Sequence, residues 1–561
     1  MGEHRGPTIE IYDTTLRDGT QGQGFNLTGA DKVAIARRLD AFGVDYVEGG
    51  WPGSNPKDVR FFEMMKQAPL SHAALAAFGS TRRKDLTAED DPNLQAMLAS
   101  ASPVVTIFGK SWTLHVTDAL GATLEQNLEM IRDSVALVKA NGRTVVYDAE
   151  HFFDGYRADP AYALATLDAA LEGGADRVVL CDTNGGSLPG TVAERVAEVC
   201  ARTEVMVGIH AHNDGELAVA NTLAAVNAGA RHVQGTINGY GERCGNANLV
   251  SVLANLVLKL GADQPQRLDA LRDLSRFVDE RANLQPSLRS PYVGDAAFAH
   301  KGGVHVSAVN KRPETYEHVP PEAVGNRRRV LLSELSGRAN VLAKSLEEGG
   351  SSDAAGHAHA VVQRLKELED RGYAFEGAEA SFRLLADKVR GVYRPYFTLH
   401  GFTVMIDKAD DASSARCEAT IRVQVGGTME HTAADGDGPV NALDRALLKA
   451  LGRFYPSLRE LHLVDYKVRV LSGPETGTAS LARVQVEMSD GRDSWGTVGA
   501  STNIIEASYE ALVDAYEYRL VATGASPQGD RPASEGASEE AATSREEDAT
   551  ARAKEAVPAA D

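Results

Sequence analysis

Eight short apolar runs recur along the first 260 residues, separated by segments with the periodicity of amphipathic helices. Runs of this length, rich in β-branched residues and alternating with helices, are typical of parallel sheets built from repeated βα units. Eight such units in about 250 residues predict a (β/α)8 barrel. A doubly wound open sheet is the alternative, but no G-x-G-x-x-G motif follows the first run. The predicted strands span residues 9–13, 45–50, 72–79, 104–110, 144–150, 176–182, 205–212 and 232–239.

The rest of the chain loses this alternation. At 561 residues the chain is too long for one core. Residues 279–390 are predicted to form linker subdomains with short helices, 342–348 and 358–372 among them. Residues 391–521 contain two similar halves at a spacing of roughly 60 residues, each with two β-rich runs before an amphipathic helix.

The predicted fold is therefore α/β, with a TIM barrel over 1–278, then the helical linker region and then a duplicated α+β regulatory or dimerising domain. Residues 522–561 contain almost no large apolar side chain. We expect this tail to be disordered, because it cannot bury enough apolar surface to fold.

Composition narrows the possible partners and location. A net charge of -20 argues against nucleic acid and anionic membranes, which both attract positive surfaces. The four cysteines are far apart and form no C-x-x-C pair, which indicates reduced thiols rather than disulfides or a zinc knuckle. The start of the sequence has no apolar signal region, and no stretch of about 18 uncharged apolar residues occurs. We expect a cytoplasmic protein.

The sequence HAHND ends the seventh predicted strand, and its two imidazoles can share a ligand. Side chains two residues apart on a strand point to the same side, so His210 and His212 converge. Such a pair binds a divalent ion about as often as it is only packed, so its neighbours decide the interpretation.

Barrel enzymes place their sites at the carboxyl ends of the strands, and the first strand ends in DTTLRDGTQ. Asp18 is the natural third ligand beside His210 and His212, and it lies next to Arg17. Alone, this stretch could be a turn with an ion pair; together with the histidines it favours a site. One carboxylate and two imidazoles suit manganese, magnesium, zinc or iron(II). Asp214 is predicted to cap the next helix or to support the site.

An open divalent site beside a fixed guanidinium is suited to a 2-oxo acid. The ion can chelate the keto and carboxylate oxygens, and Arg17 can stabilise negative charge on the keto oxygen. A carbanion partner then needs a general base, for which Glu150 and His305 are the candidates. A rim salt bridge is an equally good explanation of Glu150, and a packed linker histidine is the simpler explanation of His305.

Four motifs in sequence order resemble the family of 2-isopropylmalate, homocitrate and citramalate synthases. They are YDTTLRDGTQ, DTNGG, GIHAHNDGELAVANTLAAVNAG and VQGTINGYGERCGNANL. EGGWPGSNPKD, YDAEHFFDGY and FAHKGGVHVSAV look most like the (R)-citramalate synthases of that family. The resemblance covers the barrel, the linker and the duplicated domain.

The resemblance implies a Claisen-type condensation of acetyl-CoA with pyruvate, followed by hydrolysis to (R)-citramalate and CoA, in isoleucine synthesis. It implies an Mn²⁺, Mg²⁺ or Zn²⁺ cofactor and a homodimer with isoleucine as effector of a LeuA-type domain. The residues matched to family roles are Asp18, His210, His212 and Asn246 at the metal, Arg17 and Thr183 at the substrate, Glu150 as acid/base, and His305, which in this family enters the opposite subunit's active site.

Three other functions are open. The same reaction could use 2-oxoisovalerate or 2-oxoglutarate, as 2-isopropylmalate and homocitrate synthases do. A lyase such as the HMG-CoA lyases would lack the long C-terminal region. An amino-acid sensing protein built on an inactive barrel would lose at least one metal ligand, whereas Asp18, His210 and His212 are all present.

Overall fold

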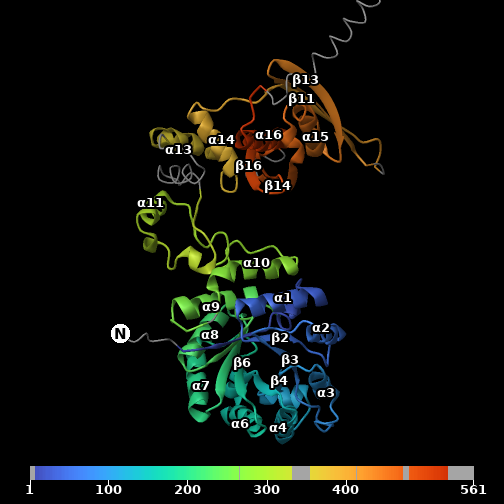
Figure 1. The fold of residues 1–561 in the computed structure, drawn as a ribbon, viewed down its shortest axis with the longest axis vertical. Helices are drawn as coiled ribbons and strands as arrows, with labels where there is room; N and C mark the ends of the chain where they lie inside the picture. The colour runs from blue at the N-terminus through green and yellow to red at the C-terminus, as the bar shows by residue number, and fades with distance from the viewer. Residues whose placement is uncertain (1–6, 265, 332–353, 412–413, 472–478, 529–561) are drawn as a thin grey trace, which may run out of the picture. The chain divides into compact units, whose positions relative to one another are not determined.

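The computed structural model describes residues 7–264, 266–331, 354–411, 414–471 and 479–528 (Figure 1). The chain divides into two compact units, Met1–Ala299 with Pro313–Arg329, and His300–Arg312 with Val330–Asp561. The first unit holds the barrel and the second holds the duplicated domain. In the described part of the chain, no helix is both long and apolar enough to cross a membrane.

The first unit is a closed barrel of eight parallel strands in sequence order. Strands β1 and β8 close it, with Ile11 opposite Val233. Closure confirms the predicted barrel and rules out the open sheet. The strands are β1 (Glu10–Asp13), β2 (Tyr46–Gly50), β3 (Ala74–Ser80), β4 (Val104–Lys110), β5 (Thr144–Glu150), β6 (Arg177–Asp182), β7 (Met206–Ala211) and β8 (His232–Gly235).

Helices surround this barrel (Figure 1). Their ends follow local chemistry: α1 begins with a capping box in which the Thr28 and Asp31 side chains satisfy free backbone amides, and it ends at Gly43, whose φ of 101° favours glycine. The helices are α1 (Gly29–Phe42), α2 (Pro56–Lys66), α3 (Pro92–Ala99), α4 (Leu124–Ala140), α5 (Phe152–Ala158), α6 (Pro160–Glu172), α7 (Pro189–Arg202), α8 (Ala218–Asn227), α9 (Leu249–Leu258) and α10 (Leu271–Arg281).

The strands have two different faces because successive side chains alternate. Outward residues such as Ile11, Val47 and Ile209 are fully buried against the helices. Inward residues form a small apolar cluster, which includes Tyr12 and Val179. Nearer the carboxyl ends of the strands, the buried inward positions become polar. These polar residues are Glu48, Thr106, Asp148, His210 and Gln234.

The second unit contains the duplicated domain. Each half is a three-stranded antiparallel sheet with one helix packed against it, and the two helices share a core. The two predicted β-rich runs before each helix are confirmed, but the prediction was incomplete, because a further strand begins each half. The halves are β11 (Thr398–Asp407), β12 (Arg416–Val425), β13 (Thr428–Gly436) and α15 (Pro439–Leu451), and β14 (His462–Val470), β15 (Ala482–Ser489), β16 (Ser494–Ser501) and α16 (Ile504–Thr523).

The linker region supplies α11 (Gly303–Lys311), α13 (Ala354–Asp370) and α14 (Glu379–Val389), and a short sheet of β9 (Ala299–His300) and β10 (Arg329–Val330). The helix predicted at 342–348 lies outside the described residues, as does the predicted tail beyond residue 528.

Candidate metal and active site

Three buried side chains converge where β1 and β7 end. The ligand atoms offered by Asp18, His210 and His212 all lie within 4.8 Å of one another. Oδ2 of Asp18 is 3.2 Å from Nε2 of His210 and 4.0 Å from Nε2 of His212. His210 is in β7 and His212 follows that strand, so the period of two places both imidazoles on the inner side.

The surroundings of this cluster fit a bound cation. Oδ1 of Asp18, Nδ1 of His212 and Oδ1 of Asn246 are buried without a hydrogen-bond partner. An unpaired buried acceptor costs about 1–3 kcal/mol, which a cation can offset. Asn246 is paired with His212 in an isolated β-bridge, so its amide lies on the same side of the barrel mouth. Oxygen and imidazole donors suit a hard-to-borderline divalent ion.

Electrostatics keep two of these donors, Asp18 and His212, in the forms that bind cations. Burial alone would raise the pKa of Asp18, but Arg17 and His210 hold it well below its usual range. Burial and the neighbouring His210 lower the pKa of His212 to about 4, so this imidazole is neutral at pH 7. An ionised carboxylate and a neutral imidazole both present lone pairs to a cation. For His210, burial lowers the pKa, but the hydrogen bond and charge of Asp18 raise it above its usual value, so a bound cation would replace a proton there.

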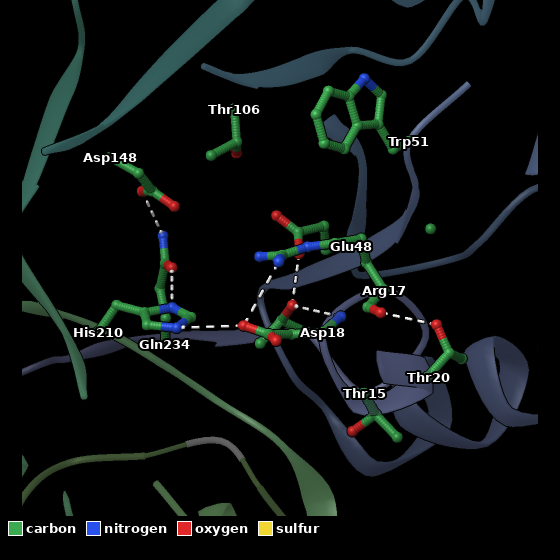
Figure 2. Close-up of polar contacts among 12 residues, drawn as sticks. Thr15, Arg17, Asp18, Thr20, Glu48, Trp51, Thr106, Asp148, His210 and Gln234 are labelled. Carbon is green, nitrogen blue, oxygen red and sulfur yellow. Dashed lines mark hydrogen bonds and ion pairs between the residues drawn. The ribbon is translucent and has the colours of Figure 1, made fainter. Parts of the chain in front are cut away.

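Arg17 is held in one orientation beside the cluster (Figure 2). Its Nε donates to Oε2 of Glu48 at 2.6 Å, and its Nη1 lies 3.3 Å from Oδ2 of Asp18. Its guanidinium carbon is 3.7 Å from the centre of the Phe78 ring. Glu48 is fully buried and also accepts hydrogen bonds from Tyr12 and Thr14. The guanidinium therefore points a fixed positive charge at the cavity.

The cluster opens into a cavity of about 180 Å³. One wall is aromatic: Trp51 meets Phe78 and Phe108 edge-on at 5.8 and 5.4 Å, and those two rings stack at 5.2 Å. The Trp51 indole donates to Oδ1 of Asn93 at 2.6 Å, which fixes the ring. The cavity is lined by Arg17, Asp18, Gln21, Trp51, Phe78, Phe108, Asp148, Glu150, Cys181, Thr183, His210, His212 and Glu242.

Two further predicted residues line the same cavity. Glu150 forms an ion pair with Lys110, its register partner on β4. The Thr183 hydroxyl accepts a hydrogen bond from the backbone N–H of His151 at 2.9 Å, which leaves its own proton for another acceptor. The cavity therefore places a carboxylate and a hydroxyl near Arg17.

Two predicted residues are not at this cavity. His305 lies on α11, in the second unit, and is not among the lining residues. Asp214 does not cap α8; the side chain that accepts from the first backbone N–H of this helix, at Ala218, is Asn213, through Oδ1 at 3.2 Å. Instead Asp214 accepts hydrogen bonds from Arg243, at 2.8 Å from Nε and 3.0 Å from Nη2. The capping interpretation was wrong because this arginine, from the loop after β8, takes both carboxylate oxygens.

Sequence reasoning did not find Glu48, Trp51 or Gln234. The first two stand in EGGW, where a glutamate interrupts a buried strand and a tryptophan follows it. A charged residue inside a predicted buried strand is a usable signal, since such groups are almost never buried without a partner. Gln234 gives no comparable signal, because a single glutamine in a strand is ordinary.

Three family models match the chain in order. Residues 8–278 match the HMGL-like family. Residues 292–373 match the homocitrate synthase post-HMGL domain-like family, and residues 376–520 match the LeuA allosteric (dimerisation) domain. Together they cover the barrel, the linker region and the duplicated domain.

Curated relatives match over almost their whole length. The chain is 54% identical to an (R)-citramalate synthase of Geobacter sulfurreducens, over 91% of this chain and 97% of the relative. It is 52% identical to that of Aquifex aeolicus, over 91% and 98% of the two chains. It is 50% identical to that of Synechocystis sp., over 91% and 96%. The chain therefore belongs to the (R)-citramalate synthase family of acyltransferases.

Proposed function

We propose that the protein condenses acetyl-CoA with pyruvate and hydrolyses the product to (R)-citramalate and CoA, as a step of isoleucine synthesis. The observation that carries this proposal is the Asp18, His210 and His212 cluster beside Arg17 in a small aromatic-walled cavity. Family membership supports the reaction, and the residues that line the cavity support the roles proposed for Arg17, Thr183 and Glu150.

The metal is proposed to be Mn²⁺, Mg²⁺ or Zn²⁺, held by Asp18, His210 and His212 with Asn246 close by. A bound divalent ion of this kind supplies Lewis-acid polarisation of the keto and carboxylate oxygens of a 2-oxo acid. The unpaired buried acceptors around the cluster support the assignment.

The protein's own residues then take separate roles. Arg17 stabilises negative charge on the keto oxygen, and the Thr183 hydroxyl donates to the substrate carboxylate. Glu150 takes a proton from the acetyl methyl group, and the methyl carbon forms a bond with C2 of pyruvate as the π bond of the keto group breaks. The keto oxygen, which receives that electron pair, then gains a proton from His305. Water then attacks the thioester carbonyl, and the CoA thiolate leaves. We propose His305 as the proton carrier, brought by the second subunit of a dimer.

The cavity favours pyruvate over larger 2-oxo acids. We propose that the aromatic wall of Trp51, Phe78 and Phe108 faces the methyl group of pyruvate and disfavours the branched side chain of 2-oxoisovalerate. 2-Oxoglutarate brings a second carboxylate, but Arg17 is the one arginine or lysine among the lining residues, so the lining offers no second cationic side chain to pair with it. An amino-acid sensing protein without catalytic activity would not need Asp18, His210 and His212 together.

We propose that the duplicated domain, which matches the LeuA allosteric (dimerisation) domain, pairs two copies of the chain and binds isoleucine as an effector. Large apolar side chains on its first and fourth strands are about half exposed, as expected of surfaces that pair between copies. They are Met405, Ile406, Leu463, Val464, Val468 and Val470. The proposed location is the cytoplasm, where the four free cysteines would stay reduced.

A thiol-release assay tests the proposal. Purified full-length protein is given acetyl-CoA with pyruvate, 2-oxoisovalerate or 2-oxoglutarate, with and without chelator. We expect CoA release with pyruvate at least about tenfold faster than with the others, and none after chelation. Equal rates with all three acids would contradict pyruvate specificity, and full release after chelation would contradict the metal site.

A further inference from the structure

Behind the proposed metal ligand His210 lies a buried chain of two hydrogen bonds that crosses the barrel interior (Figure 2). Nδ1 of His210 is 2.8 Å from Oε1 of Gln234, and Nε2 of Gln234 donates to Oδ1 of Asp148 at 2.9 Å. Gln234 is fully buried, and His210 and Asp148 are 5% and 3% exposed. The chain thus joins β7, β8 and β5 beneath the cavity.

The partners of the Gln234 amide fix its orientation. Nε2 of Gln234 donates to Oδ1 of Asp148, and the amide oxygen therefore faces Nδ1 of His210. Burial raises the pKa of Asp148 to about 7, but its Oδ1 can accept in either protonation state when the proton sits on Oδ2. Because an amide oxygen only accepts, Nδ1 of His210 must carry a proton.

This proton decides which nitrogen of His210 can bind a cation. With Nδ1 protonated, the neutral ring has its lone pair on Nε2, which is the atom 3.2 Å from Oδ2 of Asp18. The register pairing of His210 with Gln234 sets this contact through the backbone, independently of any ligand. The ring is therefore oriented before an ion arrives.

We infer that Gln234, oriented by Asp148, is a positioning residue that selects the Nε2-binding tautomer of His210 and so strengthens divalent-ion binding. The inference rests on the proposed metal site and adds a residue that contacts neither ion nor substrate. Partners of this kind change metal affinity about 10–100-fold in metalloenzymes.

Isothermal titration of chelator-treated, full-length protein with MnCl₂ tests this inference. Gln234→Met keeps the length of the side chain but removes the acceptor, and we expect Mn²⁺ affinity to fall about 10–100-fold. Gln234→Glu keeps an acceptor toward Nδ1 and can share a proton with Asp148, so affinity should stay within about threefold of wild type.

Gln266→Met is the matched control. Gln266 is another buried glutamine, but its amide donates to the backbone oxygen of Gly43, away from the ligands. We expect its Mn²⁺ affinity to equal that of wild type. If Gln234→Met does not fold, as judged by circular dichroism, Asp148→Asn replaces it, because it frees the amide to turn over. The expected loss is then about three- to tenfold.

The possible outcomes distinguish a failure of the positioning role of Gln234 from a failure of the proposed metal site. Weak binding by Gln234→Met with recovery in Gln234→Glu supports the positioning role. Unchanged Mn²⁺ affinity in Gln234→Met, or in Asp148→Asn when it replaces that variant, overturns it while the metal site stands. An equal loss in Gln234→Met and Gln234→Glu also overturns it, because the acceptor would then not matter. Wild-type protein that binds no Mn²⁺ overturns the proposed metal site and the inference together.

Discussion

The barrel and the duplicated domain both bury charged side chains, but they pair them differently. On α16 two carboxylates have phenol partners: Glu510 accepts from Tyr373 and Glu517 accepts from Tyr393, each at 2.7 Å. In the barrel, Asp18 keeps one buried oxygen without a partner. Buried charge alone therefore does not mark a site, whereas a buried acceptor left unpaired among potential ligands does.

The two regions also expose different groups. The barrel unit gathers two histidines and four carboxylates around one cavity, whereas β11 and β14 of the duplicated domain present apolar side chains such as Met405 and Val464 to solvent. The first arrangement suits chemistry and the second suits association. Changes in one region should thus affect one property and leave the other unchanged.

The largest expected effect is on the reaction rate, from a substitution at the metal cluster of the barrel. Asp18→Ala removes the carboxylate ligand and several kcal/mol of transition-state stabilisation, so the CoA release rate should fall on the order of 10³-fold or more. Asp13→Asn is the control, because burial raises the pKa of Asp13 to about 7 and the amide resembles its protonated form. Comparable activity in Asp18→Ala and wild type would contradict the role of Asp18.

The second prediction separates the positive charge of Arg17 from the fixed, planar geometry of its guanidinium. Arg17→Lys keeps a cation but loses the donor to Glu48 and the planar contact with Phe78. We expect kcat to fall about 10²–10³-fold while Mn²⁺ affinity changes little. Arg82→Lys is the control, since Arg82 is equally buried but pairs with Asp133. A kcat within threefold of wild type in Arg17→Lys would show that the fixed guanidinium is unnecessary.

A smaller effect should appear in specificity. Trp51→Ala enlarges the cavity, so the ratio of kcat/KM for 2-oxoisovalerate over pyruvate should rise about 10–100-fold. Trp112→Ala is the matched control, because Trp112 stacks on His115 and does not line the cavity. An unchanged ratio in steady-state assays of Trp51→Ala would show that this wall does not select the substrate.

A substitution on the duplicated domain should change dimer association and leave metal binding unchanged. Val464→Asp places a charge among the exposed apolar side chains of β14, and we expect the dimer dissociation constant to rise at least about tenfold, a change of about 1.4 kcal/mol. Sedimentation velocity measures this constant. Leu188→Asp alters an exposed apolar side chain of the barrel unit and should leave the dimer dissociation constant unchanged. Loss of Mn²⁺ affinity in Val464→Asp would contradict the prediction that changes in the duplicated domain leave the barrel site unaffected.

The smallest effect concerns barrel stability and its pH dependence. Although burial raises the pKa of Glu10, hydrogen bonds from Arg177 and His232 lower it to about 2. A lowered carboxyl pKa stabilises the fold above the unfolded value of about 4.5, and this stabilisation is lost as pH falls toward 2. Glu10→Gln should lower the thermal midpoint by about 2–4 °C at pH 7.

The difference between Glu10→Gln and wild type should shrink in calorimetry as the pH falls from about 4.5 toward 2. Glu63→Gln is the control, since its ion pair with Lys66 is exposed and contributes little. A midpoint difference that grows on acidification would reverse the predicted sign.

The barrel could be predicted because its signals are local. Each strand is an apolar run and each helix has its own periodicity, so the eight strands were found within a few residues of their observed ends. His210 and His212 could be grouped from spacing alone. The first strands of the two sheets were missed because their alternation is interrupted: the register shifts between Leu399 and Gly401 in β11, and between Leu463 and Asp465 in β14.

Contacts across the barrel could not be predicted in this way. That Gln234 reaches both His210 and Asp148 depends on register and on closure of the sheet, which no local pattern specifies. The same reason explains the wrong interpretation of Asp214, whose partner Arg243 is 29 residues away. Long-range polar pairing is set by the fold and not by neighbouring residues.

The most direct test of the proposed site is to return Mn²⁺ stepwise to chelator-treated protein while bound metal and CoA release with pyruvate are measured together. We expect the CoA release rate to rise in proportion to bound Mn²⁺ and to level off at one ion per chain, because Asp18, His210 and His212 form one cluster. Full CoA release before any Mn²⁺ is added would contradict the claim that this cluster holds the ion on which the reaction depends.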